Sequence, residues 1–330
     1  MENAGSSEKL TAQNALSKSL LYLIAAFRPS LWKKAGQEIL ALSRPKAGQA
    51  LSKAGLYYIL FCPLVAMPFY NTCIFHPFVC GDFDLKEIAS IKKEDCFFKN
   101  SDNIALHAWY FRNPKAARTV LLSHGNAGNL THRKELIKVL LESGASVFAY
   151  DYQGFGLSKG SPSVEACIKD AIAAYDYLHR DLKVPGNQIV LYGESIGTAF
   201  SCQLAKARPE LAAIILQSGF QSLPQIAHEK VALVKIYPKE SFPCNKLDTL
   251  EYVKGKHPPL LIIHGEKDST ISSHNADELY KAAGGETYLV KLPDADHNNV
   301  PLKLNYAALS ALSRFCRTES KVGELNPQSK

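Results

Sequence analysis

The chain has 330 residues, of which 46% are hydrophobic and 21% charged, and its formal net charge is +7. This composition excludes a disordered chain and is typical of a protein that buries a large core. The positive excess lies at the N-terminus, because residues 1–53 contain eight Lys or Arg and three acids. Positions 54–330 carry nearly equal numbers of basic and acidic side chains. Since that part is close to neutral and shows no aromatic–basic motif, we expect no nucleic-acid partner.

The cysteines give no sign of a metal centre. Eight are scattered along the chain without a Cys-x-x-Cys pair, at positions 62, 73, 80, 96, 167, 202, 244 and 316. Metal sites built on cysteine normally need such close spacing, so we expect no metal. No organic cofactor is implied by the sequence either. Their even number does not establish disulfides, and the redox compartment stays open.

An apolar stretch follows the basic segment. Residues 54–81 contain no Asp, Glu, Lys or Arg, and a bilayer span needs about 20 apolar residues. We expect a membrane anchor here, and because basic residues precede it the positive-inside rule predicts a cytoplasmic N-terminus. The alternative is an apolar helix, interrupted by Pro63 and Pro68, that packs on the domain.

Strand and helix patterns alternate over residues 82–316, and a polar tail follows at 317–330. Helices are expected at 130–143, at 163–182 with Ser163 as N-cap, and at 301–315. Such alternation predicts an α/β domain with a mostly parallel sheet and helices on both faces. Eight strands are expected, at 95–99, 104–111, 119–123, 146–151, 189–192, 212–217, 260–264 and 287–292.

The strand at 189–192 leads directly into Gly193-Glu194-Ser195-Ile196-Gly197, which precedes an Ala-rich helical segment. This strand–turn–helix context is the one that a nucleophile elbow requires. Glycines on both sides allow strand and helix to cross closely, and the helix N-terminus adds positive potential near the hydroxyl. The pattern therefore predicts Ser195 as a nucleophile, against the alternative of an ordinary Gly-rich turn.

A serine nucleophile needs a base, and the base needs a carboxylate that fixes its tautomer. In open parallel sheets these groups gather after the carboxyl ends of strands. Asp268 follows the strand at 260–264, and His297 follows the last strand. The order Ser195, Asp268, His297 predicts a catalytic triad. A solvated loop histidine is the alternative for His297.

Other acids compete with Asp268. Glu266 lies two residues nearer the strand and is the alternative catalytic acid. Asp248 stands at an expected helix start, where a capping role is favoured. Asp294 and Asp296 flank the histidine too closely in sequence to orient it.

Two further histidines also lie at strand ends. His124 and His264 each precede a glycine at such an end and are expected to make structural hydrogen bonds. An oxyanion hole requires the backbone N–H after the nucleophile, that of Ile196, and a second donor from the loop after the strand at 119–123. Asn126 is the expected second donor, with Ala127 as its substitute.

The chain resembles the α/β-hydrolase superfamily over about residues 90–316. The resemblance rests on His-Gly-Asn-Ala-Gly at 124–128, Asp-Tyr-x-Gly-Phe-Gly-x-Ser at 151–158 and Gly-Glu-Ser-Ile-Gly at 193–197, together with Asp268 and His297. It is most similar to the branch of single-pass, membrane-anchored Bem-type hydrolases, which includes relatives of protein depalmitoylases and lysophospholipid lipases. The resemblance implies an α/β-hydrolase fold and the same triad.

A lid usually occupies the region between the strand that ends near 217 and the strand that starts near 259, and this short insertion leaves room for a minimal one. A site without a large lid is more open, and it suits bulky acyl groups on lipids or proteins. Seven apolar residues could line an acyl groove or pack on the sheet: Leu223, Ile226, Val231, Leu233, Val234, Ile236 and Tyr237.

The sequence thus predicts a membrane-associated serine hydrolase of carboxylic esters or thioesters. Two alternatives stay open. A serine aminopeptidase would need an anionic pocket for a substrate amine, and a membrane-tethered scaffold would keep the fold without turnover. Fold alone does not fix the substrate.

Overall fold

The computed structural model describes residues 52–317 except 54, 239–240 and 243–246. The predictions for almost all of 1–53 and for the tail lie outside the described residues. Contacts divide the chain into two units, of which the larger comprises Pro68–Ile226 and Cys244–Lys330 and the smaller comprises Met1–Met67 and Ala227–Pro243.

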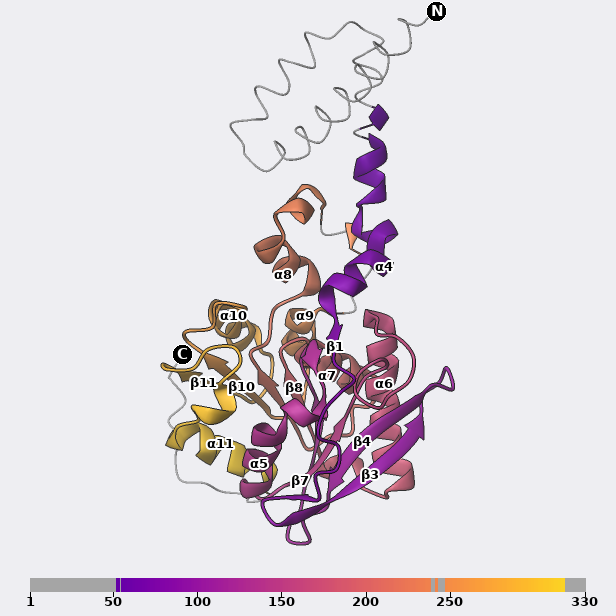
Figure 1. Ribbon diagram of the computed structural model, residues 1–330. Helices are drawn as coiled ribbons and strands as arrows, with labels where there is room; N and C mark the ends of the chain where they lie inside the picture. Colours follow the sequence, from indigo (N-terminus) through magenta and orange to yellow (C-terminus); the bar gives the residue numbers. More distant parts are fainter. Residues whose placement is uncertain (1–51, 54, 239–240, 243–246, 318–330) are drawn as a thin grey trace, which may run out of the picture. The chain divides into compact units, whose positions relative to one another are not determined.

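The larger unit is built on a nine-stranded sheet (Figure 1). Pairing is parallel from β11 to β7 and antiparallel from β7 to β2, which confirms the mostly parallel sheet. All eight predicted strands are present, and the ninth is a two-residue edge strand too short to show alternation. The order is β11 (Thr287–Leu292), β10 (Leu260–Gly265), β9 (Ala213–Gln217), β8 (Ile189–Glu194), β5 (Thr119–Ser123), β7 (Ser146–Tyr150), β4 (Ala105–Phe111), β3 (Ile91–Lys99) and β2 (Glu87–Ile88).

Helices cover both faces of this sheet, as the alternating pattern predicts (Figure 1). On one face, α5 (Lys134–Glu142) and α11 (Tyr306–Cys316) bury their apolar sides against a core that includes Trp109. On the other lie α6 (Val164–Asp176), α7 (Ile196–Ala207) and α10 (His274–Ala282). Because both faces are covered, every residue of β5 and β7 is buried.

Side-chain caps set the helix starts. The predicted N-cap Ser163 accepts a hydrogen bond from the Ala166 N–H at 3.1 Å. Asp248 caps α9 (Thr249–Lys254) by accepting from the Glu251 N–H, which confirms its capping role. The helix predicted at 301–315 begins as α11 only at Tyr306, because Asn305 caps it.

The end of the apolar stretch forms a helix and then a strand pairing that the sequence did not indicate. α4 (Pro63–Ile74) is followed by β1 (His76–Pro77), which pairs in parallel with β6 (Ala127–Gly128) in the loop after β5. Within the described part of the chain, no helix has the length and apolar character needed to cross a bilayer.

The smaller unit joins the region before α4 to the short insertion. The Tyr237 hydroxyl donates to the Tyr58 carbonyl at 2.9 Å, and the two rings lie 4.7 Å apart. Tyr237 therefore packs on the N-terminal segment, which neither interpretation of the predicted groove anticipated. Val231 is 43% exposed, whereas Val234 and Tyr237 are buried. The insertion itself contains α8 (Leu223–Lys230) and a 3₁₀ helix at Ala232–Ile236.

Candidate active site

Ser195 lies at a tight turn between β8 and α7. Its backbone has φ 56° and ψ −118°, a conformation that is strained for a residue with a Cβ atom. The flanking glycines permit the turn, since a Cβ on Gly197 would overlap the Ser123 carbonyl and one on Gly193 would lie 2.5 Å from the Thr198 Cα. The Ser195 N–H donates to the Gln217 carbonyl on β9, which ties the turn to the sheet.

His297 connects this serine to a carboxylate. Its Nε2 lies 3.1 Å from the Ser195 Oγ, and its Nδ1 lies 2.7 Å from Asp268 Oδ2. Because an ionised carboxylate only accepts hydrogen bonds, Nδ1 carries the proton and Nε2 is free to accept the serine hydroxyl proton. The imidazole side chain is 13% exposed, so a substrate can reach it while its carboxylate partner stays buried.

Asp268 is held as a buried anion by four donors. One of its oxygens accepts from the Thr270 and Ile271 N–H groups at 2.9 and 2.7 Å. The other accepts from His297 and lies 3.3 Å from His264 Nε2, which also donates to the Ile271 carbonyl. Burial raises the pKa of Asp268, but the hydrogen bonds from His264, His297 and Ile271 outweigh it and hold the pKa below its ordinary value.

The competing acids lie elsewhere. Glu266 is half-exposed, with its carboxylate 3.9 Å from Lys291. Asp294 pairs with Lys267 at the surface. Asp296 accepts from the Asn298 and Asn299 N–H groups and so shapes the turn that carries His297.

The Gly-rich loop at 124–128 lies beside the elbow because β5 and β8 are neighbours, with Ser123 paired to Gly193. A Cβ on Gly125 would lie 3.6 Å from the Ser195 Cβ. Ile196 is the first residue of α7, and N–H groups in the first turn of a helix have no intrahelical acceptor. The two predicted oxyanion donors, Asn126 and Ile196, therefore lie in the two segments that adjoin Ser195.

An ion pair that the sequence did not predict braces this loop. Arg133 Nε lies 2.7 Å from Glu194 Oε2, and both side chains are mostly buried. The Arg133 guanidinium also donates to the Ala127 carbonyl at 2.9 Å. The same Glu194 oxygen accepts from the Gly125 N–H at 3.4 Å. The two charges are far apart along the chain, and the signal available in the sequence was an acid next to the expected nucleophile.

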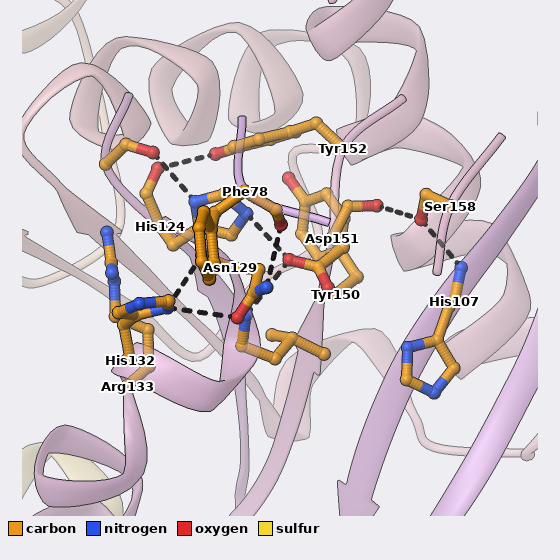
Figure 2. Close-up of polar contacts among 12 residues, drawn as sticks. Phe78, His107, His124, Asn129, His132, Arg133, Tyr150, Asp151, Tyr152 and Ser158 are labelled. Atoms are coloured by element: carbon orange, nitrogen blue, oxygen red, sulfur yellow. Dashed lines mark hydrogen bonds and ion pairs between the residues drawn. The ribbon is translucent and has the colours of Figure 1, made fainter. Parts of the chain in front are cut away.

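His124 and His264 make the structural contacts expected of them. His124 Nδ1 bonds to the Gly125 carbonyl at 2.7 Å, and its Nε2 lies 3.3 Å from Asp151 (Figure 2). The Tyr152 hydroxyl donates to the His124 carbonyl. These contacts hold the first residues of the loop at 124–128 in place.

The chain is similar to known proteins over this region. A family model described as "Serine aminopeptidase, S33" matches residues 114–250. The uncharacterized protein Rv2307c of Mycobacterium tuberculosis is 30% identical over 232 residues, which cover 70% of this chain and 81% of that protein. The α/β hydrolase domain-containing protein aho-3 of Caenorhabditis elegans is 33% identical over 208 residues, or 63% and 60% of the two chains.

Solved structures share the fold. The esterase Pf2001 of Pyrococcus furiosus superposes with a TM-score of 0.60 at 19% identity, covering 73% of this chain and 96% of its own. Acetyl xylan esterase 1 of a Thermoanaerobacterium species superposes with a TM-score of 0.52 at 15% identity, covering 64% and 80%. The order of the strands in the sheet, the tight turn at Ser195 and the similar proteins all point to the same family. The chain belongs to the α/β-hydrolase superfamily.

Proposed function

We propose that this protein is a serine esterase that hydrolyses carboxylic esters or thioesters of acyl groups. The observation that carries the proposal is the hydrogen-bonded chain from Ser195 through His297 to Asp268. Its distances are those that nucleophilic catalysis by serine requires. The esterases that share the fold are consistent with it.

Acylation begins when Ser195 Oγ attacks the substrate carbonyl carbon and its proton passes to His297 Nε2. The buried Asp268 carboxylate stabilises the imidazolium that forms. The N–H groups of Asn126 and Ile196 donate to the oxygen that becomes negative in the tetrahedral intermediate. Collapse of that intermediate breaks the carbonyl carbon–oxygen or carbon–sulfur bond, and His297 gives its proton to the leaving alcohol or thiol.

Deacylation repeats these steps with water. His297 removes a proton from water as the water oxygen attacks the acyl-enzyme, and the same two N–H groups stabilise the second intermediate. The acyl group leaves as a carboxylic acid, and Ser195 recovers its proton from His297. The cycle uses the side chains and backbone of this chain with water as co-substrate.

An ester substrate is favoured over a peptide with a free amino terminus. Aminopeptidases must bind a substrate ammonium group, which normally requires a carboxylate available to it. Glu194 is the carboxylate next to the nucleophile, and the Arg133 guanidinium neutralises it at 2.7 Å. The family description nevertheless makes the aminopeptidase the second candidate to be tested.

A substrate panel distinguishes these activities in the full-length protein. We expect turnover of p-nitrophenyl esters and acyl thioesters across a chain-length series, and none of aminoacyl anilides. Ser195→Ala abolishes turnover, whereas Ser161→Ala, a matched change in an exposed loop, leaves it unchanged. Hydrolysis of aminoacyl anilides alone would replace the esterase with the aminopeptidase. No turnover by folded protein would favour the scaffold.

We also propose that the apolar segment at 54–81 attaches the protein to a membrane with a cytoplasmic N-terminus, near lipid or acylated-protein substrates. Leu56, Ile59 and Leu60 support this, because each of these apolar residues exposes half or more of its surface. Full-length protein is then expected to sediment with membranes at high salt and to be released by detergent. Release by salt alone would indicate attachment through the basic segment.

A further inference from the structure

We infer that the segment 74–80 is a positioning part of the oxyanion hole, holding Asn126 in place. This inference rests on the esterase proposed above, and it adds residues outside every catalytic motif in the chain. The segment begins with the last residue of α4. Along the sequence it lies far before the loop that it contacts.

Asn126 is held at two points by this segment. Its carbonyl accepts a hydrogen bond from the His76 N–H at 2.9 Å. Its side-chain amide donates to the Ile74 carbonyl at 2.7 Å. Because these bonds fix both the carbonyl and the side chain, the residue cannot rotate without losing them. Its N–H is therefore held in one direction, and a preorganised donor is what oxyanion stabilisation demands.

Hydrogen bonds also hold the rest of the segment in place. Asn129, which is fully buried, donates to the carbonyl of Phe78 at 2.7 Å (Figure 2). Its side-chain amide also donates to the carbonyl of Cys80 at 2.7 Å. Phe78 also donates its N–H to the Gly128 carbonyl and accepts from the Gly156 N–H. The segment thus bridges two loops of the catalytic domain.

Apolar packing ties the segment to the nucleophile's helix as well. Phe75 is 3% exposed, and its ring stacks on Phe200 of α7 at a centroid distance of 6.5 Å. Phe155 meets it edge-on at 6.4 Å. The chain that holds Asn126 is therefore anchored on the helix whose first N–H, that of Ile196, is the second proposed donor. This packing therefore fixes the positions of the two N–H donors relative to one another.

A matched pair at His76 tests the inference in the full-length protein. His76→Pro removes the N–H that bonds Asn126, whereas His76→Ala keeps it and changes an exposed side chain. We expect kcat per fluorophosphonate-titrated site to fall about 10- to 100-fold in His76→Pro, because a displaced donor approaches the loss of one. KM should stay within about threefold, and His76→Ala, which keeps the N–H, should lose far less kcat than His76→Pro.

A second variant keeps the test decisive if His76→Pro fails to fold. Asn126→Asp retains the backbone N–H but sets a carboxylate against the Ile74 carbonyl, and about a tenfold loss in kcat is expected. Binding of a trifluoromethyl ketone, whose adduct carries an oxyanion, should weaken by the same factor as kcat/KM. A purely structural role would lower the melting temperature and leave kcat per titrated site unchanged.

The outcomes separate the two proposals. Wild-type turnover with unchanged kcat and ketone affinity in folded His76→Pro or Asn126→Asp overturns the inference and leaves the esterase intact. A wild-type protein without turnover or label removes the esterase, and the inference with it.

Discussion

The two halves of the candidate site are built differently. The proton-transfer half consists of Asp268 and His297, each in the loop that directly follows its strand, and Asp268 accepts from the Thr270 and Ile271 N–H groups of its own loop. The oxyanion half depends on contacts between distant parts of the chain, because the segment 74–80 bonds Asn126 and Arg133 bonds Glu194. Local motifs can therefore specify the acid–base pair, whereas the donors of the hole need the whole fold to orient them.

The largest expected effect is on the proton-transfer half. His297→Gln removes the base, and we expect kcat to fall by about 10⁴-fold or more. His274→Gln, on the exposed start of α10, is the matched control and should keep wild-type activity. An active His297→Gln protein would assign the base to another residue, and steady-state ester hydrolysis measures this.

The identity of the acid comes next. Asp268→Asn should lower kcat by about 10³- to 10⁴-fold, because the amide no longer holds the productive imidazole tautomer. Glu266→Gln should change kcat less than about twofold, since this carboxylate faces Lys291. Reversal of these two results in parallel kinetic assays would transfer the role to Glu266.

The Arg133–Glu194 pair tests the oxyanion half. Arg133→Met or Glu194→Gln leaves its partner unpaired beside the loop, and each should lower kcat about tenfold with little change in KM. The double variant should be no worse than the poorer single variant, because the two side chains act as one brace. Additive losses in this double-mutant cycle would contradict a shared role.

The smallest effect concerns the pH dependence of stability. Because the pKa of Asp268 is lowered in the folded protein, the unfolded chain binds more protons between that pKa and about 3.9. The carboxylate's contribution to the free energy of unfolding is then complete above about pH 5 and declines on acidification. Urea titrations of wild type and Asp268→Asn should show a constant difference from pH 7 to 5 and a smaller one at pH 3.

A surface pair serves as the control for that titration. Asp294→Asn breaks the exposed contact with Lys267, which salt screens, and should change stability little at any of these pH values. A difference between wild type and Asp268→Asn that grows on acidification would mean that the pKa of Asp268 is raised, not lowered, by folding.

The sequence predicted the sheet and the approach of Ser195, Asp268 and His297 because strand periodicity and strand-end loops are local signals. The contacts around Asn126 left no such signal. β1 and β6 are two residues long, which is too short for alternation, and they pair across a long stretch of intervening chain. Tyr58 and Tyr237 meet across 179 positions, so an apolar pattern could not identify their partner.

The central claim, an activated Ser195, is tested most directly by fluorophosphonate labelling of the full-length protein with mass spectrometry of the adduct. We expect one labelled residue, Ser195, with labelling lost in Ser195→Ala and His297→Gln and retained in Ser161→Ala. Folded wild-type protein that takes up no label, or that is labelled at another residue, would contradict this claim.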